Sequence, residues 1–301
     1  MAVIERIGAD AWRDRVSRGD FAGLHAALAP DGTPEVRAVL AGQAPRIVAV
    51  AAPHGVAPSV VDLVPAGWDE REAVDLHGLR FEGHEPHRAL VHHPDDRALW
   101  TTPVEGPDVH TVPVGPIHAG IIECGHFLFH VVGERVLHVD ARLFHKHRGL
   151  ERHAEGRTPE DAGRVLSRVC AGCAATNAVA YASAVEDALG RMPGEGTRLV
   201  RTLLIELERM WNHLNDVSQI CAGVGLAPGT MMFATLKERV QRVCAQLTGH
   251  RFMFDAVTLT AAPADPGDAA REAMRAELAA VAADAATAAR GLLFDTSLRD
   301  R

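Results

Sequence analysis

The sequence has no run of about 18 consecutive apolar residues, the length that a helix needs to cross a bilayer. Residues 1–20 carry charges throughout and show no apolar segment of the kind that a secretory signal requires. We therefore expect a cytoplasmic chain with no direct membrane span. Any attachment to a membrane would then run through partner subunits.

Basic residues and cysteines are also in short supply. The chain has 31 Lys and Arg against 39 Asp and Glu, with no clustered basic face, so nucleic acid is excluded as a partner. The five cysteines are an odd number in a chain without an export signal, which favours reduced thiols or metal ligands over a disulfide framework. Histidine is frequent by contrast, with 17 residues, so metal binding and proton handling both have to be considered.

The hydrophobic pattern predicts an α+β fold that begins with a small α/β domain. Residues 1–100 read as mixed α/β, with a helix at 11–29 and a short buried strand at 46–50. Prolines and glycines gather at 101–116, where they predict a linker or an extended crossing segment. We place the domain boundary there.

The second domain, residues 117–301, is expected to be a small antiparallel sheet followed by a helical bundle. Two apolar segments flank Gly133 and Glu134, and a two-residue loop with glycine first suits a type II′ hairpin. A helix should start at Thr158, which offers a capping hydroxyl before Pro159. The two hairpin segments are 127–132 and 135–140, and further helices are predicted at 198–217, 231–255 and 266–294.

Residues 67–84 are rich in charged side chains, with Gly78 and Gly83 permitting turns. By composition alone, a charged surface segment is as good an interpretation as a functional one. The run from Trp68 to His84 nevertheless closely resembles a signature of the 30 kDa subunit of respiratory complex I. That resemblance implies a 30 kDa-like domain over residues 1–100, with a structural role for this segment against a neighbouring 49 kDa subunit.

Residues 115–127 place His118 and Glu123 just before the first strand of the hairpin. Both groups can transfer protons near neutral pH, although a solvated loop is the simpler interpretation of the residues alone. The run resembles the opening of group-4 nickel–iron hydrogenase large subunits. The resemblance implies that Glu123 lies near the metal and passes protons, that His118 is catalytic, and that the hairpin borders a quinone pocket in complex I relatives.

Residues 144–151 combine basic side chains with one acid and could simply form an exposed basic turn. They resemble a second hydrogenase run, matched at His147, Arg148, Gly149 and Glu151. The resemblance implies that His147 and Arg148 lie at the redox site as catalytic residues and that Glu151 helps to bind the cofactor.

A single C-x-x-C, Cys170 and Cys173, falls in a segment that we expect to be helical. Two thiolates at this spacing can hold a soft metal or form a redox disulfide, and one pair is half of a four-thiolate site. The segment resembles the hydrogenase motif that supplies two of four nickel ligands. By that resemblance Cys170 and Cys173 are metal ligands and Arg168 is a cofactor-binding residue.

Three departures from the family pattern bear on the metal. Ala171 stands where the family has glycine, Asn177 stands where it has histidine, and a second C-x-x-C is absent from these 301 residues. The resemblance therefore implies a C-terminally short hydrogenase-like domain whose nickel–iron centre is incomplete in this chain. The alternatives are a metal-free, quinone-facing subunit and an assembly scaffold whose cysteine pair is inert or holds zinc.

A later segment, residues 206–214, supports the same family without adding chemistry. Glu206, Arg209 and His213 share one helix face, which alone indicates a solvated or ion-paired surface. Cys221 and Cys244 read as buried small hydrophobes. The fused layout resembles formate hydrogenlyase large subunits. It implies a subunit of a hydrogenase-like or NADH–quinone oxidoreductase-like complex at the inner face of the cell membrane, with a small iron–sulfur subunit and membrane subunits as partners.

Overall fold

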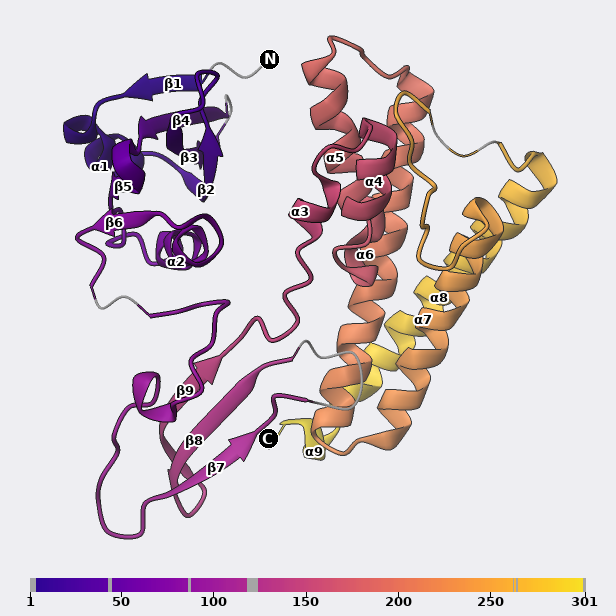
Figure 1. Ribbon diagram of the computed structural model, residues 1–301. Coiled ribbons are helices and arrows are strands. Elements are labelled where there is room, and N and C mark those ends of the chain that lie inside the picture. The colour runs from indigo at the N-terminus through magenta and orange to yellow at the C-terminus, as the bar shows by residue number, and fades with distance from the viewer. Residues whose placement is uncertain are drawn as a thin grey trace. The chain divides into compact units, whose positions relative to one another are not determined.

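The computed structural model describes residues 4–42, 45–85, 88–117, 124–261, 263 and 265–299. The chain forms two compact units, Ala2–Arg148 and Gly149–Arg301 (Figure 1). The first unit contains a mixed sheet with helices and a separate antiparallel sheet, and the second is helical. The predicted α+β class, with a small α/β part, a small antiparallel sheet and a helical bundle, is confirmed.

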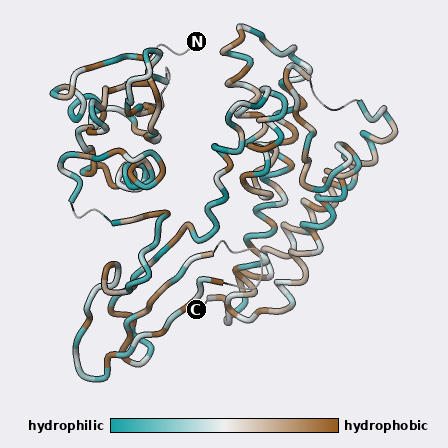
Figure 2. The backbone as a smooth tube through the Cα atoms, in the orientation of Figure 1, coloured by the Kyte–Doolittle hydropathy of each residue, from teal (hydrophilic) through white to brown (hydrophobic). Residues whose placement is uncertain are grey.

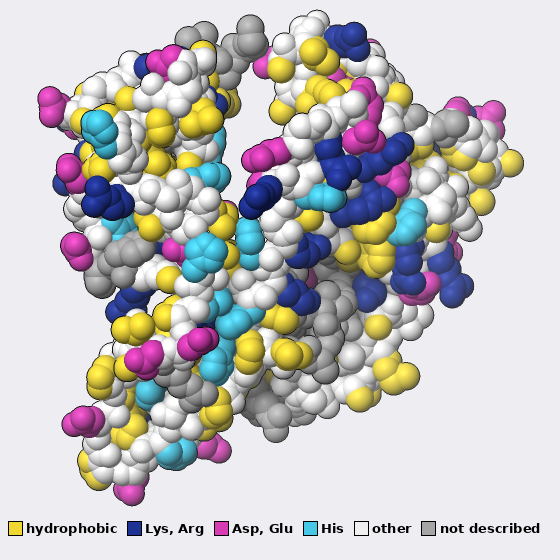
Figure 3. Space-filling view, viewed as in Figure 1, with side chains coloured by type: hydrophobic (Ala, Val, Ile, Leu, Met, Phe, Trp, Pro, Cys, Tyr) yellow, Lys and Arg dark blue, Asp and Glu magenta, His cyan; other side chains and the backbone are white. Residues whose placement is uncertain are grey.

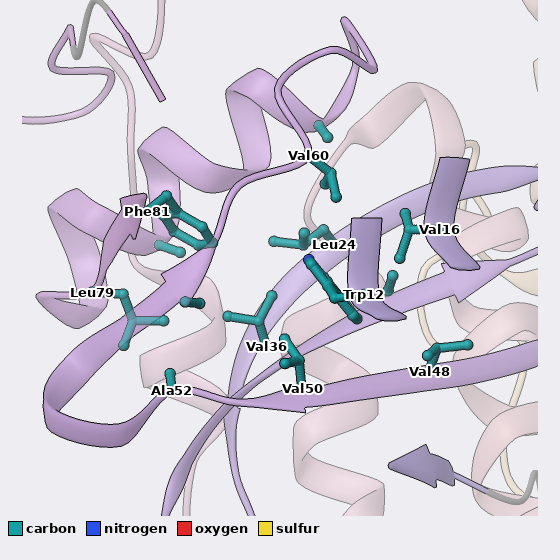
Figure 4. Close-up of a cluster of buried hydrophobic side chains, with 14 of the residues drawn as sticks. Trp12, Val16, Leu24, Val36, Val48, Val50, Ala52, Val60, Leu79 and Phe81 are labelled. Carbon is teal, nitrogen blue, oxygen red and sulfur yellow. The ribbon is translucent and has the colours of Figure 1, made fainter. Parts of the chain in front are cut away.

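The mixed sheet of the N-terminal unit has the strand order β1-β4-β3-β2. Strand β1 runs parallel to β4, and β3 pairs antiparallel with both β4 and β2. Trp12 and Val16 of the first helix are fully buried and meet the apolar strand residues in one core (Figure 4). The elements are β1 (Ile4–Ile7), α1 (Ala9–Ser17), β2 (Phe21–Leu28), β3 (Pro34–Leu40), β4 (Arg46–Ala51), β5 (Val56–Pro58), α2 (Ala66–His77) and β6 (Arg80–Glu82).

The predicted strand at 46–50 is confirmed as β4, whereas the predicted helix at 11–29 is confirmed only as far as Ser17 and is wrong beyond it. Helix α1 ends at Ser17, and the alanine-rich remainder forms β2. Alanine is the strongest helix former, but helix propensity is small for any residue, and pairing with β3 outweighs it here. A Cβ on Gly19 would lie 2.7 Å from Leu40 Cδ1, so glycine lets the chain turn closely against β3.

The antiparallel sheet has the order β7-β8-β9, from His110–Val114, His126–Val132 and Arg135–Arg142. The predicted hairpin is confirmed, with Gly133 at φ 58° as a turn with glycine first requires. Strand β7 lies inside the segment 101–116, where the prolines and glycines predict a linker or an extended crossing segment. Pro113 is tolerated because β7 is an edge strand.

The C-terminal unit is built on three long helices that share one core. Leu204 and Trp211 of α6, Phe233 and Val240 of α7, and Val281 of α8 are buried together. Hydrophilic and hydrophobic residues are interspersed along these helices, as in amphipathic helices that bury one face (Figure 2). The elements are α3 (Leu150–Ala154), α4 (Pro159–Leu166), a 3₁₀ turn (Ala171–Cys173), α5 (Ala174–Ala188), α6 (Glu195–Gly223), α7 (Ala227–Thr248), α8 (Asp268–Leu292) and α9 (Thr296–Arg299).

The helices predicted after residue 158 are confirmed with somewhat different bounds. The Thr158 hydroxyl accepts a hydrogen bond from the Asp161 amide and caps α4 as expected. The compact units divide after Arg148, so the antiparallel sheet belongs to the first unit. The domain boundary that we placed at 101–116 stays a prediction. Within the described residues, no helix is both long and apolar enough to span a bilayer.

Candidate functional site

The cysteine pair lies in a tight turn between α4 and α5, and the prediction that it is inside a helix is wrong. Cys170 has extended backbone, with φ −141° and ψ 129°, and the next three residues form one 3₁₀ turn. The turn is closed by the Cys173 amide, which donates to the Cys170 carbonyl at 3.3 Å. Both cysteines are exposed, and their side chains are within hydrogen-bonding contact of each other.

Glu208, a buried residue of α6, fixes the point at which α5 begins. Its carboxylate accepts the amides of Ala175 and Thr176 at 2.7 and 2.9 Å, together with the Thr176 hydroxyl. A carboxylate at a helix N-terminus satisfies free amides and suits the positive end of the helix dipole. This capping group comes from 32 residues further along the chain, so the pattern around the cysteines could not predict that the helix starts only at Ala174.

Asn212 lies one helical turn beyond Glu208 and holds the cysteine turn itself. Its Nδ2 donates to the Gly172 carbonyl at 2.6 Å and to the Glu208 carbonyl at 2.9 Å. A Cβ on Gly172 would lie 3.3 Å from Asn212 Oδ1, so a larger residue would press on the side chain that holds the turn. Two α6 side chains therefore position the segment that carries both thiols.

The protonation of Cys173 bears on what the pair can do. Burial, a hydrogen bond with Cys170, and the negative charges of Cys170 and Glu208 raise the pKa of Cys173 to about 11. The residue is therefore a neutral thiol at neutral pH, unlike the low-pKa cysteines that act as nucleophiles. A bound cation would reverse this, because metals take up thiolates and release their protons.

Arg168, which precedes Cys170 by two residues, already has an acidic partner. Its guanidinium makes a bidentate ion pair with Asp255 at 2.7 and 3.1 Å, and it lies 4.8 Å from the centre of the Phe254 ring. The hydrogen bond from Arg168 lowers the pKa of Asp255. Figure 3 shows further Lys and Arg side chains gathered over α3 and α4, where Arg152 and Arg164 are exposed.

The loop that carries Asp255 is anchored by a buried ion pair. Arg201 of α6 meets Glu186 of α5 at 2.7 and 2.8 Å, and both side chains are only 3–4% exposed. Arg201 also donates to the Thr258 carbonyl at 2.9 Å, and Glu186 accepts the Thr260 amide at 2.7 Å. The hydrogen bond from Arg201 lowers the pKa of Glu186. The pair thus ties two helices to the loop after α7.

The structure brings together only part of the predicted site, namely Arg168, Cys170 and Cys173. His118 and Glu123 lie outside the described residues. The other predicted residues stay predictions: His147 and Arg148 are exposed at the end of the N-terminal unit, and Glu151 is exposed in the first turn of α3.

The face of α6 that carries Glu206, Arg209 and His213 is confirmed as a solvated, ion-paired surface. Glu206 and Arg209 form an exposed ion pair and His213 is exposed, so this face is a solvated one. The face that holds the cysteine turn carries Glu208 and Asn212 instead. Their i, i+4 spacing was the available signal, because it places both on one face.

The 67–84 segment performs structural work inside the N-terminal unit. Buried Glu70 accepts the Ser59 hydroxyl at 2.8 Å and the Val60 amide at 2.6 Å, and it lies 2.7 Å from His84 Nδ1. The Asp75 carboxylate accepts three successive amides, those of residues 90–92. The motif therefore locks α2 to the segments before and after it.

The metal ligands that the described residues offer fit part of a nickel–iron centre. Two exposed thiols offer soft ligands of the kind that such metals take. In the part of the chain that the structure describes, no three His, Cys, Asp or Glu side chains are grouped so that they could hold a metal. The remaining ligands would have to come from elsewhere.

The sequence matches two protein families and several known proteins. Residues 148–222 match the family described as nickel-dependent hydrogenase, and residues 29–104 match the 30 kDa subunit of respiratory-chain NADH dehydrogenase. Hydrogenase-4 component G of Escherichia coli is 36% identical over 221 residues, which cover 64% of this chain and 40% of that protein. Formate hydrogenlyase subunit 5 of the same organism is 35% identical, covering 64% of this chain and 39% of that protein.

A solved structure agrees at the level of the fold. A chain of the membrane-bound sulfane sulfur reductase, an archaeal respiratory membrane complex, superposes with a TM-score of 0.60 at 23% identity, covering 66% of this chain and 53% of that one. This chain spans about 40% of the length of the two curated relatives above. The chain is therefore similar to group-4 hydrogenase subunits, with one segment that matches the 30 kDa NADH dehydrogenase subunit family and another that matches the nickel-dependent hydrogenase family.

Proposed function

We propose that this chain is part of the large subunit of a hydrogenase-like membrane redox complex, in which Cys170 and Cys173 supply half of the thiolates of a nickel–iron site. The observation that supports this most directly is the exposed cysteine pair, held in a fixed turn by Glu208 and Asn212. A bound nickel–iron centre would supply the redox chemistry of protons and hydrogen. The remaining ligands would come from polypeptide outside these residues.

The other predicted residues take roles around that centre. Glu123 would pass protons, His118, His147 and Arg148 would lie at the reacting groups, and Glu151 would help to bind the cofactor. Arg168 would do so only by sharing or leaving its ion pair with Asp255. A small iron–sulfur subunit and membrane subunits would complete the complex at the inner face of the cell membrane, where a quinone is a further candidate ligand.

Nickel content tests the proposal. In the complex purified without oxygen from its native host, we expect close to one nickel per chain, and the substitutions Cys170→Ser and Cys173→Ser should each abolish it, because a hydroxyl is a poor ligand for a soft metal. Nickel is measured by plasma mass spectrometry, since iron from partner subunits would obscure an iron assay. Cys124→Ser is the matched control, because Cys124 lies outside the pair and should leave nickel unchanged.

A metal-free, quinone-facing subunit or scaffold is the second candidate. The observations that favour it are Asn177 in place of the expected histidine and the raised pKa of Cys173, which keeps the thiol neutral when no cation is bound. Absence of nickel from a complex with its partner subunits still attached would reject the first candidate in favour of this one. Substitutions at His118 or His147 should then slow quinone-linked turnover, while Cys170→Ser is tolerated; in a scaffold, none of them alters a redox rate.

A further inference from the structure

The N-terminal unit contains a small cavity whose described lining is cationic. The volume is about 130 Å³, and the wall includes Arg71, Arg88, His93, Trp100 and Arg142. The remaining described lining residues are Trp68, Ala89, Leu90, Pro94, Leu99, Ala141, Leu143 and Phe144, so no acidic side chain is among them. Such a wall excludes a cation and favours an anion.

Three residues of this wall each leave a buried nitrogen without a hydrogen-bond partner among the described residues. The atoms are Arg142 Nη2, Trp100 Nε1 and His93 Nε2. Buried polar groups are nearly always paired, and a buried group left without a partner lowers the stability of the fold. Three such groups around one cavity indicate that an acceptor belongs there.

The protonation of His93 follows from its neighbour. Arg142 Nε donates to His93 Nδ1 at 3.3 Å, so Nδ1 is an acceptor and the proton of the neutral ring is on Nε2. Burial, helped by the charges of Arg142 and His145, lowers the pKa of His93, while the Leu143 carbonyl opposes that shift. The neutral ring therefore presents an N–H donor, as the indole and the guanidinium do.

The donors are held rigidly. The Arg142 guanidinium lies 4.6 Å from the centre of the Trp100 ring and donates through Nη1 to the Pro94 carbonyl at 3.1 Å. The His93 ring stacks on His145 at 4.4 Å. Asp95 acts on Arg142 through its charge but makes no ion pair with it within the described part of the chain. The positive charge of Arg142 thus lacks a bonded counter-ion.

We propose that this cavity binds a small free oxyanion of the carboxylate or phosphate type, held by the N–H groups of Arg142, Trp100 and His93. Such an anion supplies only acceptors, which is what three unpaired donors on residues that line one cavity need. The volume accommodates a few heavy atoms, since a water molecule occupies about 30 Å³ of liquid. Acetate and inorganic phosphate are therefore suitable probes.

Indole N–H signals in a ¹H–¹⁵N spectrum of the full chain provide the test. We expect the Trp100 signal, identified by its loss in Trp100→Phe, to shift saturably when acetate or phosphate replaces chloride at constant ionic strength. The indoles of Trp12 and Trp211 are also unpaired but do not line the cavity, so they should stay still. Saturation by either anion supports the proposal and identifies the type that is preferred.

Two variants and a control make the result specific. By calorimetry, Trp100→Phe should weaken anion binding several-fold and Arg142→Lys on the order of tenfold or more, because a bond to a charged donor is the stronger one. Arg80→Lys, an exposed arginine on β6 outside the cavity wall, should bind as the parent does. The proposal is overturned if neither anion saturates the Trp100 signal, or if well-folded Trp100→Phe and Arg142→Lys both bind with parental affinity.

Discussion

Replacing Arg201 with methionine should destabilise the C-terminal unit by about 3–5 kcal/mol, the range for removing one partner of a buried ion pair. Glu186 would then be a carboxylate 3% exposed with no cation beside it, and the Thr258 carbonyl would lose its donor. Methionine fills much of the same volume, so the loss reports on charge rather than on a void. Urea unfolding at neutral pH, followed through the helical circular dichroism signal, measures the difference.

The difference in free energy of unfolding between the parent and Arg201→Met should become smaller as the pH falls. In the parent, the pKa of Glu186 is lowered by Arg201, so its contribution to stability is present above the ordinary glutamate pKa and is lost as pH falls through the lowered value. In Arg201→Met the same carboxyl is buried without compensation, and protonation relieves its cost at mildly acidic pH. Arg198→Met, an exposed arginine one turn earlier on α6, is the control and should change stability little. An equal loss at neutral and acidic pH would show that packing, not charge, is responsible.

The local pattern predicted elements wherever local and tertiary preferences agree. The hairpin around Gly133 and the cap at Thr158 follow from backbone conformations and hydrogen bonds that lie within a few residues. Strand β2 was not predicted, because its alanines favour a helix and only pairing with β3 makes the segment a strand. Strand β7 was not predicted, because Pro113 is tolerated only at the edge of a sheet and the sequence does not reveal that position.

The candidate site also depends on long-range contacts that local sequence patterns did not predict. The spacing of Cys170 and Cys173 identified the pair as metal-ligand candidates without any structure. The pair is positioned by Glu208 and Asn212, whose hydrogen-bond partners Thr176 and Gly172 lie 32 and 40 residues earlier, and a contact at that range leaves no local signature. Asp255 was missed for a similar reason, since its partner Arg168 lies 87 residues earlier. Residues that bear chemistry could be recognised by type, whereas those that orient them required the fold.

Replacing Glu208 with alanine should cost about 3 kcal/mol and release the cysteine turn. The carboxylate accepts hydrogen bonds from two backbone amides and one hydroxyl. Because the Ala175 residue is buried, removal of the carboxylate leaves its amide without an acceptor from the protein or from water. With α5 uncapped, the 3₁₀ turn that carries Cys170 and Cys173 loses the element that defines its end. Hydrogen exchange at the amides of Ala175 and Thr176 should become much faster, by roughly a hundredfold for a local loss of about 3 kcal/mol.

Glu206→Ala is the matched control for that change. Glu206 lies on the same helix, half a turn away, and its ion pair with Arg209 is exposed at both ends, so the substitution should cost well under 1 kcal/mol. Glu208→Gln separates charge from shape: its carbonyl can still accept one amide, so it should retain part of the protection. If exchange at Ala175 were unchanged in Glu208→Ala, the cap would be dispensable and the turn would have to be held by Asn212 alone. Under the proposed nickel site, the same variant should lose nickel although both cysteines remain, because the turn that carries the two thiols would no longer be held in place.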